Sequence, residues 1–142
     1  MAKLKTFLVP VDFSRGSEKA FEYALRSARQ SKAKLVALNV VPAELVYPPA
    51  GGQFDFYGLM ERDARDHFAR LAKRKGVKAG ECQLLLGRGT DFAAVIVRQA
   101  KKLRAAMIIM GSHGRTGLRR FLLGSVAERT LRYADCPVLI VK

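Results

Sequence analysis

The stretch Met107-Ile108-Ile109-Met110-Gly111-Ser112-His113-Gly114 begins with four apolar residues and ends in a short loop bounded by glycines. A second pair, Gly124-Ser125, follows after nine further residues. The apolar run predicts a buried strand, and Ser125 predicts the start of a helix. Glycines let backbone N–H groups approach an anion closely, and a helix start offers further unpaired N–H groups. The stretch therefore predicts a phosphate cradle between a strand and a helix.

Apolar runs typical of strands alternate along the chain with segments of helical periodicity. Strands are predicted over 4–11, 34–41, 77–86, 105–110 and 137–141. Helices are predicted from Ser14 or Ser17, over 59–75, from Thr90 or Asp91, and from Ser125. This alternation favours an α/β fold, Rossmann-like, with a single open five-stranded parallel sheet and helices on both faces. We assign residues 1–142 to one domain and expect the strand order 3-2-1-4-5, which the alternation alone does not fix.

The chain is strongly basic, with 26 Lys and Arg against 12 Asp and Glu and a formal net charge of +14. Between Phe92 and Ala134 the only acidic residue is Glu128, whereas nine residues are basic: Arg98, Lys101, Lys102, Arg104, Arg115, Arg119, Arg120, Arg129 and Arg132. Such a charge attracts polyanions without identifying one, and the alternative is a well-solvated surface. A polyanion bound on this basic face is one candidate partner.

Several other classes of protein are disfavoured by the sequence. Cys82 and Cys136 have neither metal-site nor disulfide spacing, and the two histidines have no Cys or His neighbours. No apolar run approaches the length of a membrane span, and the N-terminal run is too short for a signal peptide. We therefore expect a cytoplasmic protein without a membrane segment. The longest irregular stretch, 42–57, is of a length that is often functional, and its role stays open.

Two loops are expected to face each other at one edge of the sheet. Ligands of open parallel sheets bind beyond the carboxyl ends of the strands, where the strand order reverses. If the first strand lies between the second and the fourth, the loops that begin at Asp12 and Gly111 line that crevice. Asp12 is then either a ligand-binding carboxylate or a residue that caps the turn after the strand.

Three separate segments of the chain resemble the universal stress protein family. They are Val9-Pro10-Val11-Asp12-Phe13-Ser14, the pattern Gly-x-x-Gly, nine residues, Gly-Ser, and Cys136-Pro137-Val138-Leu139-Ile140-Val141. The resemblance covers essentially the whole chain, and 42–57 is the segment that matches least. Ala106 departs from the family, because many members carry an acidic residue just before the fourth strand. The glycine pattern is intact, so the departure leaves the implied site in place.

The resemblance implies a binding site for ATP, or for AMP or ADP, together with Mg²⁺. Asp12 would contact the ribose and would hold Mg²⁺ together with phosphate oxygens. The Val40 backbone would read the adenine edge, and the glycine loop and the Val126 amide would hold the phosphates. The implied nucleotide-binding residues are Pro10, Asp12, Val40, Met110, Gly111, His113, Gly114, Arg115, Gly124, Ser125 and Val126.

The roles of four side chains near the cradle stay open. Ser125 and Glu128 form a capping-box pattern, and the Ser125 hydroxyl can instead, or also, bind a phosphate. His113 is either a phosphate contact or an exposed loop residue. Arg115 directly follows the first glycine pair and is the main candidate for phosphate charge, whereas Arg119 and Arg120 fit ligand and solvent equally well.

Three functions are compatible with these features. The first, implied by the resemblance, is a nucleotide-dependent sensor or switch in the stress response. It would act as a homodimer through the strand at 137–141, which would otherwise be an exposed apolar edge. The second is slow ATP hydrolysis or adenylyl transfer, but no general base with an orienting partner and no Walker lysine are evident. The third is the binding of a polyanion. Nucleotide binding without true catalysis agrees best with the sequence.

Overall fold

The computed structural model describes residues 4–43, 55–114 and 122–142. One parallel sheet has the strand order β3-β2-β1-β4-β5. Its strands are β1 (Thr6–Pro10), β2 (Lys34–Pro42), β3 (Cys82–Gly89), β4 (Met107–Gly111) and β5 (Val138–Val141). The helices that connect them are α1 (Arg15–Ser31), α2 (Phe56–Arg74), α3 (Phe92–Leu103) and α4 (Ser125–Tyr133). The predicted fold class and strand order are confirmed.

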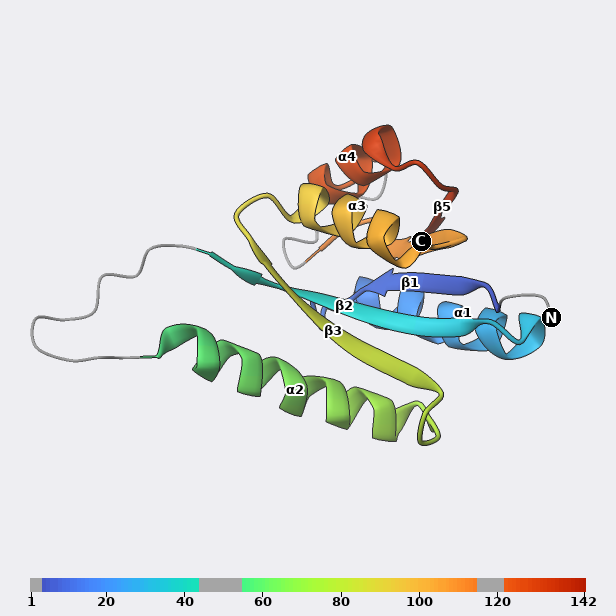
Figure 1. Ribbon diagram of the computed structural model, residues 1–142, viewed down its shortest axis with the longest axis horizontal. Coiled ribbons are helices and arrows are strands. Elements are labelled where there is room, and N and C mark those ends of the chain that lie inside the picture. The colour runs from blue at the N-terminus through green and yellow to red at the C-terminus, as the bar shows by residue number, and fades with distance from the viewer. Residues whose placement is uncertain (1–3, 44–54, 115–121) are drawn as a thin grey trace, which may run out of the picture.

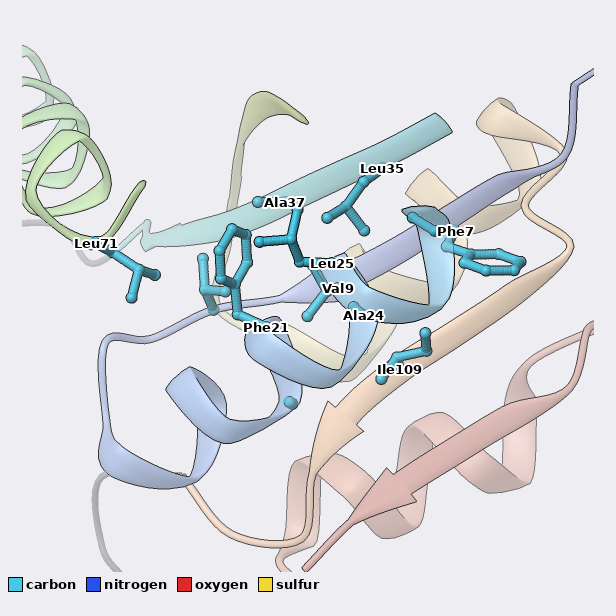
Figure 2. Packing of buried hydrophobic residues seen from close by; sticks show 12 residues of the cluster. Phe7, Val9, Phe21, Ala24, Leu25, Leu35, Ala37, Leu71 and Ile109 are labelled. Atoms are coloured by element: carbon cyan, nitrogen blue, oxygen red, sulfur yellow. The ribbon is translucent and has the colours of Figure 1, made fainter. Parts of the chain in front are cut away.

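Helices cover both faces of the sheet, with α1 and α2 on one side and α3 and α4 on the other (Figure 1). Successive side chains of a strand point to opposite faces, so each central strand contributes side chains to two hydrophobic cores, one on each face of the sheet. In β1, Val9 packs with Phe21 and Leu25 of α1, as Figure 2 shows. Its neighbour Leu8 packs on the other face with Ile96 of α3. The apolar runs at β1 and β4 are therefore strands buried on both faces.

Three of the four helices begin at a residue whose side chain accepts a hydrogen bond from the first turn. Ser14 accepts from the Ser17 N–H, Asp55 from the Gly58 N–H and Asp91 from the Ala94 N–H. Such caps satisfy N–H groups that have no partner within the helix. Ser14 and Asp91 were among the predicted alternatives for the starts of α1 and α3.

Several predicted boundaries are wrong; the first strand spans Thr6–Pro10 rather than 4–11, and the third ends at Gly89 rather than at 86. The third strand begins at Cys82, because 77–81 form a turn in which Gly80 has a φ of +78°. Arg29 of α1 holds this turn through hydrogen bonds to the Gly76 carbonyl and to the Glu81 carboxylate. The irregular stretch predicted to reach Tyr57 ends earlier, because α2 starts at Phe56. Most of that stretch, 44–54, lies outside the described residues.

Ion pairs fasten α2 and the turn after it to α1. Arg74 pairs with Glu18 at 2.8 Å and Lys75 pairs with Glu22 at 3.2 Å. The Arg29 guanidinium and the Lys78 N–H both contact Glu81, and they lower the pKa of its carboxyl to about 2. These contacts hold α1 and α2 in one layer.

Neither a metal cluster nor a disulfide is found in the parts of the chain that the structure describes. Cys82 and Cys136 are free thiols, and burial raises the pKa of Cys82 to about 12. Among the described helices, none is long and apolar enough to cross a membrane.

Candidate functional site

Asp12 and Gly114 meet at the carboxyl edge of the sheet, where the strand order reverses. Asp12 follows β1, and Gly114 follows the neighbouring strand β4. A Cβ atom added at Gly114 would lie 3.0 Å from Asp12 Oδ2. The two loops therefore face each other closely, as the predicted crevice requires.

Asp12 is held in place by the first turn of α1. The Ser14 N–H and hydroxyl both donate to Asp12 Oδ1, at 2.9 and 2.5 Å. The Asp12 N–H donates in turn to Ser17 Oγ at 3.2 Å. One carboxylate oxygen thus organises the turn, while Oδ2 lies beside the glycine loop. The turn-capping role and a ligand-binding role are compatible in this geometry.

Gly111 packs against the backbone of α1. A Cβ atom added at Gly111 would lie 2.9 Å from both the carbonyl carbon and the carbonyl oxygen of Gly16. A Cβ atom at Gly16 would likewise lie 3.0 Å from the His113 carbonyl oxygen. Because backbone cannot move aside as a side-chain tip can, Gly111 is needed for packing whether or not a ligand is bound. Sequence reasoning missed Gly16, whose signal is a glycine in the first turn of a helix.

Helix α4 begins beside the same loop, but not with the predicted capping box. Gly124 is the N-cap, Ser125 is the first helical residue, and no side chain among the described residues caps the helix. The Gly124 N–H donates to the Ser112 carbonyl at 2.7 Å, and a Cβ atom at Gly124 would lie 2.9 Å from that oxygen. This close approach places glycine at the cap, and Glu128 pairs with Arg132 at 2.9 Å instead. The first N–H groups of α4 therefore lie next to the glycine loop without a side-chain acceptor.

His113 is half-buried rather than exposed. Its Nδ1 lies 3.0 Å from the Ser112 hydroxyl oxygen. Its Nε2 is buried and has no hydrogen-bond partner among the residues that the structure describes. A buried polar atom without a partner is uncommon in proteins and marks a place where a ligand atom or water is expected.

The remaining implied residues lie around the crevice. Pro10 ends β1 and is half-buried, whereas Met110 is buried with 5% of its surface exposed. Met110, Val40 and Val126 all belong to the core under α3 and α4, so they line the apolar side of this edge. Arg115 lies outside the described residues, as do Arg119 and Arg120.

A hollow lies beside the Asp12 loop, and no sequence pattern predicted it. Its volume is about 410 Å³, and it is lined by Asp12, Phe13, Ser14, Glu18, His67, Arg70 and Arg74. Phe13 has a φ of +63°, a strained conformation for a bulky residue, and it stacks on His67 of α2. Helix α2 therefore contacts the residue that follows Asp12.

A crevice at the strand-order switch of a doubly wound parallel sheet defines a Rossmann-like α/β domain. Within that class, the model of the universal stress protein family matches residues 3–142, and the chain belongs to this family. A universal stress protein of Methanocaldococcus jannaschii is 36% identical, over 97% of this chain and 82% of that protein.

Solved structures share the fold. The universal stress protein UspA of Lactobacillus plantarum superposes with a TM-score of 0.78, at 22% identity and over 100% of both chains. A universal stress protein solved in complex with cAMP has a TM-score of 0.64 and 27% identity, over 99% of this chain and 98% of that one. The similarity to UspA of Lactobacillus plantarum concerns the fold alone. The relative solved with cAMP has an adenine nucleotide as its ligand.

Proposed function

We propose that this chain binds an adenine nucleotide, ATP or else AMP or ADP, and serves as a nucleotide-dependent sensor in the stress response. The observation that carries the proposal is the close opposition of Asp12 and Gly114 beside the uncapped first turn of α4. A relative of the same fold was solved with cAMP, which agrees with an adenine nucleotide as the ligand.

Three features of this edge fit a polyphosphate. The Gly114 position has no side chain, and among the described residues a Cβ atom there would approach only Asp12 Oδ2. The α4 N–H groups carry the positive end of a helix dipole and have no side-chain cap. The buried Nε2 of His113 lacks a partner among the described residues. In our proposal, these donors and the amides of Gly111, Ser125 and Val126 hold the phosphates.

The other half of the ligand lies towards β1 and β2 in this proposal. Asp12 Oδ2 accepts from the ribose or binds Mg²⁺ that is shared with phosphate oxygens, because Mg²⁺ prefers one or two carboxylates together with phosphates. The Val40 backbone reads the adenine edge, and Pro10 and Met110 supply apolar contact. Arg115, directly after the loop, adds positive charge. ATP and AMP differ in the length of the phosphate chain that the bound nucleotide would place in this site.

Binding agrees with the geometry better than hydrolysis. A general base is usually held by a second polar group that orients it towards the reacting atom. His113 faces a serine hydroxyl rather than a carboxylate, and Asp12 is held by the backbone and hydroxyl of Ser14. At most a slow ATPase is expected from these groups. A single-turnover assay with Mg²⁺-ATP checks this, and ATP that is consumed within minutes would establish the enzyme instead.

The test of nucleotide binding is direct. Mass spectrometry of the purified protein, after mild denaturation, identifies any nucleotide that it carries. Isothermal titration calorimetry then compares the wild type with Gly114→Val, whose side chain would occupy the cradle. We expect binding in the wild type and none in the variant. Equal affinity in the two proteins would refute the proposed site.

We also propose that the protein is a homodimer formed through β5. This strand lies at one edge of the sheet, and its four residues, all apolar, are half-exposed. Edge strands with free N–H and C=O groups pair readily with another strand. Sedimentation equilibrium checks the dimer. A purely monomeric protein at micromolar concentration would contradict it.

A second function, the binding of a polyanion, is favoured by the net charge of +14. The basic face predicted between Arg98 and Arg132 is only partly available, because Arg129 pairs with Asp91 and Arg132 pairs with Glu128. Retention on a column of immobilised heparin, released by salt, tests this function. A protein that passes through the column in low salt does not have it.

A further inference from the structure

A group of exposed cations lies at the edge of the sheet opposite the proposed nucleotide site. Six exposed side chains at the starts of β1 and β2 and at the ends of α1 and α3 form what we call the amino-edge band: Lys5, Lys32, Lys34, Lys101, Lys102 and Arg104. Within the described parts of the chain, none of the six takes part in an ion pair. We propose that the amino-edge band binds the phosphate backbone of a nucleic acid.

Backbone hydrogen bonds bring the four segments of the band together. The Lys34 N–H donates to the Lys5 carbonyl at 2.7 Å, which joins the start of β2 to that of β1. The Ala106 N–H donates to the Thr6 carbonyl at 2.8 Å, which joins the connection after Arg104 to the other side of β1. Lys32 ends α1 on one face of the sheet and Arg104 ends α3 on the other. The band therefore crosses the sheet from one helix layer to the other.

The size of the band suits a nucleic acid strand. With each helix layer roughly 10 Å from the sheet, the band is about 20 Å long. One strand of a DNA duplex presents a phosphate about every 3.4 Å along the helix axis, so the band spans about six phosphates. Lysines act as point charges on phosphate and carry no base-reading pattern, so binding independent of sequence is expected.

The charges beside the band favour a strand of phosphates over a membrane surface. Glu81 directly precedes β3 at one side of the sheet, and Asp135 precedes β5 at the other. Because Glu81 is paired with Arg29, Asp135 is the carboxylate that a flat anionic membrane pressed against the whole edge would meet. A phosphate strand that follows the band passes to one side of Asp135.

Stabilisation of helix dipoles is the alternative reason for some of these cations. Lys101 and Lys102 lie in the last turn of α3, where positive charge is favourable. That reason does not account for Lys5 and Lys34, which lie at strand starts. The position of the band is therefore unexplained by local helix stability alone.

The test compares two triple variants with the same loss of charge. The band variant carries Lys34→Gln, Lys101→Gln and Lys102→Gln. The control carries Arg26→Gln, Arg62→Gln and Arg65→Gln, three exposed arginines of α1 and α2 that are in no ion pair among the described residues. Circular dichroism verifies that both fold. Fluorescence anisotropy follows a labelled DNA duplex of about 20 base pairs over a range of salt concentrations.

The expected result is a weaker and less salt-dependent interaction for the band variant only. Each lost phosphate contact flattens the slope of log K against log salt by about 0.9, which amounts to roughly 2.7 for three contacts. If both variants bound the duplex equally weakly, polyanion binding would be retained as a function, but the proposal that the amino-edge band is its site would be refuted. Band-dependent binding to phosphatidylserine vesicles, with no difference on DNA, would also overturn it. A wild type that ignores the duplex at low salt would overturn the band and the polyanion function together.

Discussion

The ring of Phe13 stacks on the imidazole of His67, with ring centroids 5.1 Å apart and an interplanar angle of 24°. Phe13 adopts a left-handed backbone conformation directly after Asp12, and His67 belongs to α2. A bulky residue with positive φ is strained and persists only where its surroundings hold it. Phe13 packs against the core as well as on His67, so α2 is one of the elements that support the turn that positions Asp12.

Loss of the stack should therefore weaken both the fold and the site. His67→Ala is expected to lower the free energy of unfolding by about 1 kcal/mol, the usual worth of an aromatic pair. It should also weaken ATP binding, because the Asp12 turn loses its support. His67→Phe retains a ring and should restore both quantities. Urea unfolding and calorimetry measure them, and a His67→Ala protein with wild-type values would show that the stack supports nothing.

Gly111, which ends β4, and Gly114, in the loop after it, should respond differently to alanine. At Gly111 a Cβ atom would meet the Gly16 backbone at 2.9 Å, so Gly111→Ala should cost about 1–3 kcal/mol of stability. At Gly114 a Cβ atom would meet, among the residues that the structure describes, only the tip of the Asp12 side chain, and the backbone there is not left-handed. Gly114→Ala should thus melt like the wild type yet bind ATP less well. Thermal melts and calorimetry of the pair check this, and equal melting temperatures for the two variants would refute the distinction.

Ser125→Ala should separate phosphate binding from helix capping. Gly124, not Ser125, is the N-cap of α4, so stability should change by less than about 0.5 kcal/mol. If the hydroxyl donates to a phosphate, ATP affinity should fall by roughly 1 kcal/mol, or about fivefold. Asp91→Ala is a matched control at a true cap, where about 1 kcal/mol of stability should be lost. A drop in the melting temperature of Ser125→Ala comparable to that of Asp91→Ala would restore the capping role.

The Glu81 contact should make stability depend on acid pH. Its carboxyl has a pKa of about 2 in the folded protein against an ordinary value of 4.5. A lowered folded pKa means that the stabilisation is complete above about pH 4.5 and is lost as the pH falls through 2. Glu81→Gln should therefore be less stable than the wild type at pH 7, and the difference should shrink towards pH 2.

The control for this titration is Glu61→Gln, which removes a carboxylate that pairs with Arg88 on the surface. It should change stability less at pH 7, because Glu81 also accepts a hydrogen bond from the Lys78 N–H, whereas among the described residues the Glu61 carboxylate accepts only from Arg88. Urea unfolding over the acid range measures both variants. A difference between wild type and Glu81→Gln that stays constant from pH 7 to pH 2 would contradict the assignment.

Short sequence patterns correctly predicted the features of the fold that depend on residues close together in the chain. Two-sided apolar runs identified the central strands, and the positions of Asp12 and Gly111 at strand ends predicted that the loops after them face each other. The Ser125–Glu128 pattern misled, because the cap is decided by the approach of Gly124 to Ser112, a contact across an intervening stretch of chain. The contacts of Gly16 with Gly111 and of Phe13 with His67 also join distant segments. Such contacts follow from packing geometry, which residue spacing does not contain.

The two ends of the first strand bear on how two ligands would influence each other. Lys5 precedes β1 and Asp12 follows it, and seven residues of nearly extended chain span about 23 Å. This separation exceeds the Debye length of about 8 Å at physiological ionic strength, so a charge at one end is screened from the other. The charge of a nucleotide at Asp12 would therefore not change the binding free energy of a polyanion at Lys5, and the two binding free energies would add. Any cooperativity between them would have to be transmitted mechanically, as a shift of β1 itself.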